Sequence, residues 1–78
     1  MIQIDIEFDS SRYQIFVDDG DLSVNEWSQW FDGLNDGFNT IWGKHQHIDV
    51  KTYKVEFLPT IFKFKKSSVK SFSVKEIN

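Results

Sequence analysis

Residues 2–17 decide the fold and read IQIDIEFDSSRYQIFV, with apolar and polar side chains alternating on both sides of Ser10-Ser11. This alternation predicts two strands with one buried face each, because successive side chains of a strand point to opposite sides. Folding the stretch at Ser10-Ser11 predicts an antiparallel hairpin whose alternating apolar residues share one face. The predicted pairs are Phe8 with Tyr13, Ile6 with Ile15, Ile4 with Val17 and Asp9 with Arg12.

A long amphipathic helix is predicted after this hairpin. Ser23 and Glu26 have the spacing of a capping box, which satisfies free backbone N–H groups at a helix start. Apolar residues then recur at helical spacing as far as Trp42, and Gly43 is the expected C-terminal cap. The stripe consists of Trp27, Trp30, Phe31, Leu34, Phe38, Ile41 and Trp42.

The remaining positions of this segment are poor helix formers. Gly33 and Gly37 are the costliest, at about 1 kcal/mol each relative to alanine. We therefore expect the helix to depend on packing against a sheet rather than on propensity. The two glycines lie one turn apart on such a helix, which predicts the close approach of another backbone along that flank.

Residues 48–76 are predicted to form a three-stranded meander. The apolar phase changes within residues 48–57, which indicates a β-bulge near Lys51-Thr52, and Pro59 is expected to end the strand. Turns are predicted at residues 58–61 and 67–69. The expected pairs are Phe57 with Phe62, Val55 with Phe64, Glu56 with Lys63, Phe64 with Phe72, and Phe62 with Val74.

These elements predict a single α+β domain over residues 1–78 in the order ββαβββ, with one amphipathic helix packed on one face of an antiparallel sheet of up to five strands. Thirteen of the 78 residues are aromatic, and a few large rings can build the core that a chain of this length needs. The chain has no cysteine, which excludes disulfides and thiolate chemistry and favours a cytoplasmic location. We expect no secretion signal and no membrane association.

The net charge of −3 conceals two oppositely charged halves: residues 1–43 carry −8 and residues 44–78 carry +5. Such asymmetry raises the question of charged partners, although strands from the two halves can also neutralise each other. The acidic half predicts a patch, formed by an Asp-rich turn and the outer helix face, that attracts a protein partner with a basic surface. Its candidate residues are Asp18, Asp19, Asp21, Asn25, Gln29, Asp32 and Asp36.

The basic half supports a second hypothesis, nucleic-acid binding through the lysine-rich C-terminal strands. Its candidate residues are Lys54, Lys63, Lys65, Lys66 and Lys70. Against it, the predicted register turns Phe62, Phe64 and Phe72 toward the core, where they cannot stack on bases. A third hypothesis is a structural homo-oligomer that uses a sheet edge or the outward-facing Phe16, which is expected opposite Asp5.

Little in the sequence points to catalysis or to a cofactor. His45, His47 and Asp49 alternate along an extended segment and could offer three metal ligands, but the chain has no further His to complete a site, so no metal is predicted. No spacing pairs two carboxylates as acid and base, and a one-helix domain offers little concavity. We therefore expect a small, acidic, non-enzymatic protein-binding module, monomeric or homodimeric. Stoichiometric inhibitors such as immunity proteins, antitoxins and phage-encoded inhibitors of host defence nucleases share this general character.

Overall fold

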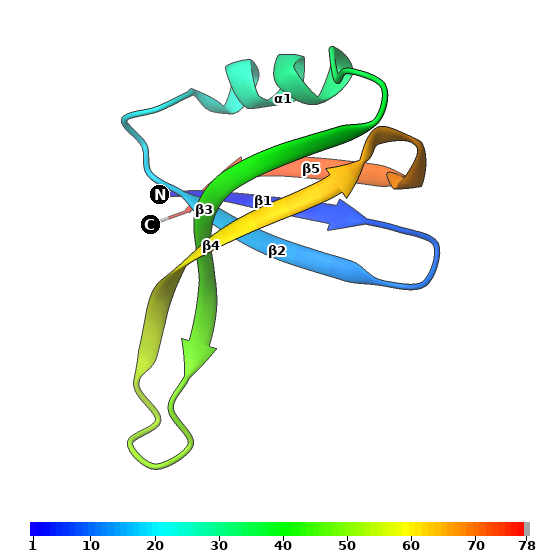
Figure 1. Cartoon of the computed structure of the whole chain (residues 1–78). Helices are drawn as coiled ribbons and strands as arrows, with labels where there is room; N and C mark the ends of the chain where they lie inside the picture. Colours follow the sequence, from blue (N-terminus) through cyan, green and yellow to red (C-terminus); the bar gives the residue numbers. More distant parts are fainter. Residues whose placement is uncertain (78) are drawn as a thin grey trace.

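A computed structural model describes residues 1–77 as one helix lying across a five-stranded antiparallel sheet (Figure 1). The elements in chain order are β1 (Ile2–Glu7), β2 (Arg12–Val17), α1 (Val24–Asp32), β3 (Phe38–Ile48), β4 (Val55–Lys65), the short 3-10 helix η1 (Lys66–Ser68) and β5 (Ser71–Glu76). The strands lie in the order β4-β3-β2-β1-β5. This arrangement confirms the predicted fold class and element order.

The core fills the space between α1 and the inner face of the sheet. Ile2, Ile4 and Ile6 of β1 are fully buried, and α1 buries Trp27 and Phe31 against them. The halves of β3 and β4 nearest α1 cross over the front of β1 and β2 and close this core (Figure 1). Because Ile2, Ile4 and Ile6 all lie on the buried face of β1, the predicted alternation of this strand is confirmed.

The register of the first hairpin differs from the prediction by two residues. Ile4 lies opposite Ile15, Ile6 opposite Tyr13 and Ile2 opposite Val17. The turn is longer than a Ser-Ser turn, because Phe8 leaves the ladder and its N–H donates to the carbonyl of Ser11 at 2.8 Å. A shift of two residues keeps every side chain on its predicted face. The expected Asp9–Arg12 pair is wrong, since Arg12 lies opposite Glu7 and donates to its carboxylate at 3.1 Å.

The helix begins as predicted and ends ten residues earlier. Ser23 caps α1 with the full capping box, in which the side chains of Ser23 and Glu26 each accept the other's backbone N–H. The predicted extension to Trp42 is wrong, because α1 ends at Asp32 with Gly33 as its C-cap. Gly37 has a φ of +88°, so it forms part of the connecting loop and not a second glycine on a helix flank.

Residues 38–65 form one long hairpin in place of the predicted bulge and meander. Ile48 ends β3 and lies opposite Val55, so the change of apolar phase marks a reverse turn and not a bulge. The predicted turn at residues 58–61 is also wrong, and with it the three pairs expected across that turn. Pro59 lies in the middle of β4, opposite Lys44. Because β4 is an edge strand, a residue without an N–H is tolerated there.

The last strand joins the opposite edge of the sheet. The turn predicted at residues 67–69 overlaps η1, and β5 then pairs with β1 rather than with β4. Phe72 therefore lies opposite Ile6 and Val74 opposite Ile4, and the predicted pairs of Phe64 with Phe72 and of Phe62 with Val74 are wrong. Both rings still reach one core, because Phe31 of α1 stacks on Phe72 at 4.6 Å and on Phe64 at 6.1 Å between ring centroids.

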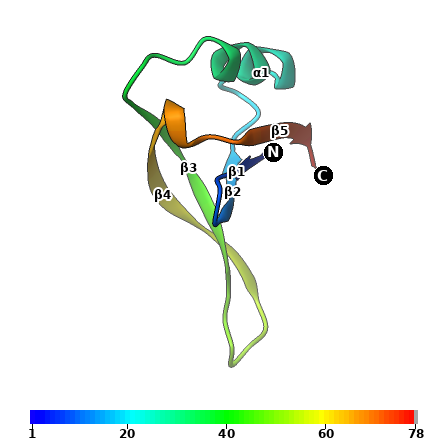
Figure 2. The same cartoon turned by 90° about the vertical axis from the view of Figure 1, so that its right-hand side faces the viewer.

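The far half of the long hairpin, residues 44–60, projects from the body, and we call it the arm (Figures 1 and 2). It bends away where β3 crosses β2, a junction with the single residue pair Phe16–Lys44. Phe16 lies on the outer face as predicted, but opposite Gln3 rather than Asp5. It is only 3% exposed, because the ring of Phe57 from the arm covers it at 5.0 Å. The prediction of an exposed Phe16 is therefore wrong.

Candidate functional site

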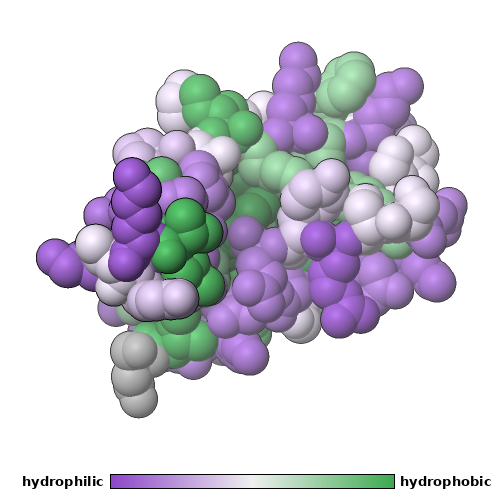
Figure 3. Space-filling view, turned by 90° about the horizontal axis from the view of Figure 1, so that it is seen from below, coloured by the Kyte–Doolittle hydropathy of each residue, from purple (hydrophilic) through white to green (hydrophobic). Residues whose placement is uncertain are grey.

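Exposed apolar side chains are concentrated on the long hairpin. Ten large hydrophobic residues are exposed within residues 1–77, of which nine belong to residues 38–61 and the tenth is Tyr13. The nine are Phe38, Trp42, Ile48, Val50, Tyr53, Val55, Phe57, Leu58 and Ile61. A view from below, toward the tip of the arm, has apolar side chains at the surface between polar ones (Figure 3). Clustered apolar exposure of this kind is typical of interaction surfaces.

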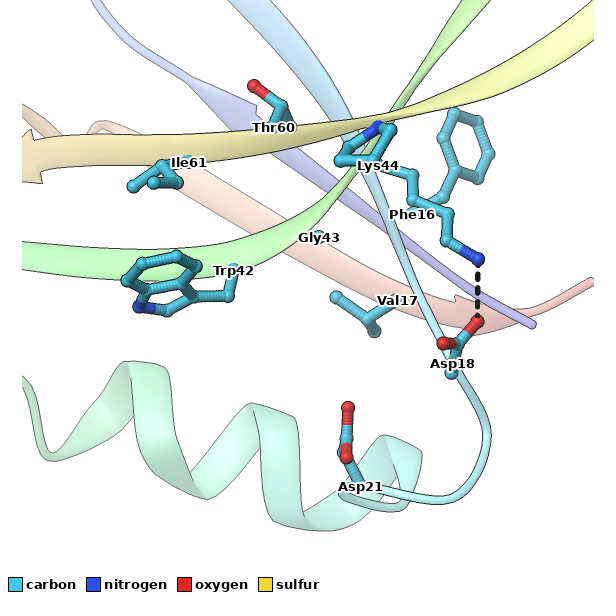
Figure 4. A pocket seen from close by; sticks show the side chains of 10 residues that line it. Phe16, Val17, Asp18, Asp21, Trp42, Gly43, Lys44, Thr60 and Ile61 are labelled. Atoms are coloured by element: carbon cyan, nitrogen blue, oxygen red, sulfur yellow. Dashed lines mark hydrogen bonds and ion pairs between the residues drawn. The ribbon is translucent and has the colours of Figure 1, made fainter.

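A cleft of about 640 Å³ lies at the base of the arm (Figure 4). Its apolar lining comes from β2, β3 and β4, and consists of Phe16, Val17, Trp42, Pro59 and Ile61. Trp42 is 72% exposed, so most of its indole is free to contact a partner. Trp42 and Ile61 lie opposite each other on neighbouring strands, which places both side chains on the outer face of the sheet.

Charged groups lie on one side of this cleft. Lys44 donates to the carboxylate of Asp18 at 3.3 Å, and Asp21 also lines the cleft (Figure 4). Within residues 1–77 Asp21 forms no ion pair, so the cleft carries one uncompensated negative charge. Two of the predicted acidic residues, Asp18 and Asp21, are thus brought beside an apolar surface.

The other predicted acidic residues are distributed over three places. Asp19 pairs with the amino group of Met1; this contact lowers the pKa of the Asp19 carboxyl and raises that of the amino group. Asp36 follows the helix and pairs with Lys66 at 3.8 Å. Asn25, Gln29 and Asp32 are exposed on α1 itself. The predicted acidic patch is therefore divided between the cleft, the N-terminus and the helix.

The turn at the tip of the arm is held by Asp49. Its carboxylate accepts the backbone N–H groups of Lys51 at 2.8 Å and of Thr52 at 3.1 Å, and these bonds lower the pKa of Asp49. Tyr53 completes the turn in the left-handed region, with a φ of 57°. The turn presents Val50 and Tyr53, which are 82% and 81% exposed.

A pH dependence follows from this turn. The pKa of Asp49 is lower in the folded chain than its ordinary value of 3.8. The ionised carboxylate therefore contributes fully to folding stability above pH 3.8, and this contribution is lost as the pH falls through the lowered pKa. We expect the amide signals of Lys51 and Thr52 to titrate below the ordinary pKa and to exchange faster in Asp49→Ala. Nuclear magnetic resonance measures both effects. Asp32→Ala is the control. Titration of these two amide signals at the ordinary pKa, or exchange as fast in Asp32→Ala as in Asp49→Ala, would contradict this account.

The side chains considered for a metal are not assembled into a site. His45 and His47 lie on one face of β3, opposite Leu58 and Glu56, whereas the Asp49 carboxylate is bonded within the turn. Within residues 1–77 no group of three His, Cys, Asp or Glu side chains is placed to hold a metal ion.

The candidate lysines also lie in separate places. Lys63 and Lys65 are on the outer face of β4, with their ammonium groups 4.8 Å and 5.4 Å from the ring centre of Phe38. Lys66 pairs with Asp36, and Lys70 pairs with Glu7 at 3.9 Å. Lys54 lies at the tip of the arm. Among these candidate lysines, Lys63 and Lys65 are therefore the two neighbouring cations that form no ion pair within residues 1–77.

Phe38 and Trp42 are the residues that sequence reasoning assigned to the wrong place. Both fit a helical stripe, yet both also alternate with Asn39, Ile41 and Gly43 as outward residues of a strand. The signal that distinguishes the two patterns is the loop-forming segment 33–37, which contains two glycines, an asparagine and an aspartate.

No protein-family model, curated protein or solved structure matches this chain. Within residues 1–77 no helix is long and apolar enough to cross a membrane.

Proposed function

We propose that this chain is a non-enzymatic protein-binding module that docks through the arm and the cleft at its base. The observation that carries the proposal is the concentration of nine exposed large hydrophobic residues on residues 38–61. Apolar surface gathered on one element and flanked by polar groups is what protein interfaces use as their centre.

The shape of the arm supports the same proposal. A two-stranded ribbon is at best marginally stable alone in water, and its apolar side chains gain most when a partner covers them. Ile48, Val55 and Phe57 lie on one face of the arm, and Leu58 lies on the other. A partner that contacts both faces of the arm would bury all four side chains.

The charge of the cleft supports a partner with a basic surface. The free carboxylate of Asp21 lies in the same cleft as the exposed indole of Trp42. A carboxylate beside an aromatic face suits an Arg or Lys side chain, because the cation gains both a charge-assisted hydrogen bond and a cation–π contact. A stoichiometric inhibitor of a basic protein is one form that such a module can take.

The non-enzymatic part of the proposal rests on the contents of the cleft. Its titratable side chains are Asp18, Asp21 and Lys44, and two of these three are engaged with each other. This set supplies neither an activated nucleophile nor a matched acid and base. The cysteine-free sequence supports a cytoplasmic setting.

Photo-crosslinking in an extract of the cells that make the protein tests the proposal. Benzoylphenylalanine in place of Val50 or Tyr53 is expected to capture one partner, and the same probe in place of Asn25 on α1 is expected to capture none. Ile48→Ser with Val55→Ser removes an opposing apolar pair of the arm, and we expect capture to fall about tenfold or more.

A matched pair of variants distinguishes the arm from the helix face. Asp32→Lys with Asp36→Lys changes the acidic residues around α1 and is expected to leave capture at position 50 unchanged. Loss of capture in that variant, with full capture by the arm variant, would overturn the proposal in favour of docking through α1. Crosslinking to a second copy of the chain alone would overturn it in favour of a homo-oligomer.

A further inference from the structure

The end of the long hairpin opposite the arm carries a second, smaller groove of about 360 Å³. Its lining combines aromatic rings, hydroxyl groups and two cations, and contains no acidic side chain. The residues are Phe8, Ser11, Tyr13, Phe38, Phe62, Lys63, Phe64, Lys65 and Ser68. The groove shares no lining residue with the cleft at the base of the arm.

Phe38 is the exposed platform of this groove. It lies opposite Lys65 on β4, and Lys63 lies two residues along the same strand, so the three side chains share the outer face of the sheet. Phe38 is 60% exposed, and the ammonium groups of Lys63 and Lys65 contact its ring at 4.8 Å and 5.4 Å from the centroid. One ring face of this kind is typical of sites that stack on a planar ligand.

The electrostatics of the groove favour an anion. Neither Lys63 nor Lys65 forms an ion pair within residues 1–77, whereas Lys44, Lys66 and Lys70 each do. Their two charges therefore act on whatever enters the groove, although the whole chain carries a net charge of −3. The hydroxyl groups of Ser11, Tyr13 and Ser68 add hydrogen-bonding groups beside them.

We propose that this groove binds single-stranded nucleic acid, with a base stacked on Phe38 and the flanking phosphates held by Lys63 and Lys65. An exposed aromatic ring beside two lysines that form no ion pair in the described chain matches a ligand that alternates planar bases with negative charges. An acidic peptide matches the charges but brings no planar ring to Phe38, and a duplex keeps its base faces stacked inside. Single strands of DNA and RNA share the required chemistry.

Fluorescence anisotropy with labelled oligo-dT and oligo-rU, at low and moderate salt, tests this proposal on the full chain and distinguishes DNA from RNA. We expect binding of one or both oligonucleotides, with the logarithm of affinity falling with a slope of about −1.4 against the logarithm of salt concentration for two phosphate contacts. Phe38→Leu keeps an apolar side chain but removes the ring face, and we expect it to weaken binding about tenfold. Phe38→Tyr is expected to retain binding.

Charge reversal has a matched control in the same chain. Lys63→Glu with Lys65→Glu is expected to abolish binding. Lys51→Glu with Lys54→Glu, which makes the same change in net charge at the tip of the arm, is expected to reduce it less than threefold. Circular dichroism checks that each variant is folded.

Three results would overturn the proposal. The first is the absence of binding to both oligonucleotides at low salt. The second is an equal loss in the two lysine double variants, because binding would then depend on net charge and not on this groove. The third is competition by polyglutamate as effective as that by unlabelled oligonucleotide, which would identify an acidic protein segment as the ligand. Loss of partner capture by the arm variant is a separate result, so this proposal and the protein-binding proposal can fail independently.

Discussion

Replacing Ile4 with alanine is expected to destabilise the fold by about 3 kcal/mol, within the range of about 2–5 kcal/mol for truncation of a buried Ile. Ile4 is 0% exposed and lies in β1, opposite Ile15 on one side and Val74 on the other. Strands on both sides prevent the sheet from collapsing into the space that the lost methyl groups leave. The cost therefore includes a cavity in addition to the lost burial.

This loss should be a large fraction of the total folding stability of the domain. A chain of 78 residues is expected to have a total stability of roughly 4–12 kcal/mol. A loss of about 3 kcal/mol lowers the melting temperature of such a domain by about 15 °C. Thermal and urea denaturation, followed by circular dichroism, measure both quantities.

Ile48→Ala provides the matched control for Ile4→Ala. The same truncation on the exposed arm is expected to change the free energy of unfolding by no more than about 0.5 kcal/mol. If Ile48→Ala costs as much as Ile4→Ala, the arm belongs to the core and its apolar side chains are not available for a partner. This comparison thus separates residues that hold the fold from those proposed to bind.

The elements that could be predicted are those with local causes. The alternation in β1 places Ile2, Ile4 and Ile6 on one face whatever register the hairpin adopts. The start of α1 depends on Ser23 and Glu26, which lie three residues apart and satisfy each other. Neither feature needs information about distant parts of the chain.

The errors arose where two local patterns fitted equally well. Phe38, Ile41 and Trp42 continue the apolar stripe of α1, but in the structure they belong to β3, which forms eleven residue pairs with β4. Those pairs join segments up to 27 residues apart in the sequence, as with Phe38 and Lys65. Periodicity within one segment cannot report such pairing, which overrides weak helix propensity.

The candidate sites were misjudged for the same reason. Assigning Phe38 and Trp42 to a helix removed two of the exposed aromatic residues from the surface of the sheet. A strand tolerates proline only at the edge of a sheet, and the sequence does not reveal which strand lies at the edge. A turn was therefore expected at Pro59, which divides β4 in two and leaves no continuous arm. The charges of Asp18, Asp21, Lys63 and Lys65 were recognised, but the aromatic residues beside them were not.

Gly43 controls where the arm leaves the body, and replacing it with alanine is expected to cost about 2–3 kcal/mol. A Cβ at this position would lie 2.7 Å from the carbonyl oxygen of Phe16 and 2.9 Å from a methyl group of Ile15. The first of these is a backbone atom, so the clash cannot be relieved by a rotamer change. β3 has to move away from β2 at the one residue pair, Phe16–Lys44, that joins the two strands.

The displacement should reach the arm. Phe57 covers Phe16 from the arm, and we expect Gly43→Ala to expose both rings and to shift the amide signals of the arm more than those of β1 and β5. Gly20→Ala is the matched control, because nothing lies within 4 Å of a Cβ there, and it should be nearly neutral. If Gly43→Ala is equally neutral, the arm is not fixed by the crossing of β3 and β2. If Gly43→Ala loses stability and partner capture together, while Ile48→Ser with Val55→Ser loses only capture, the angle of the arm and its apolar side chains are separate requirements for binding.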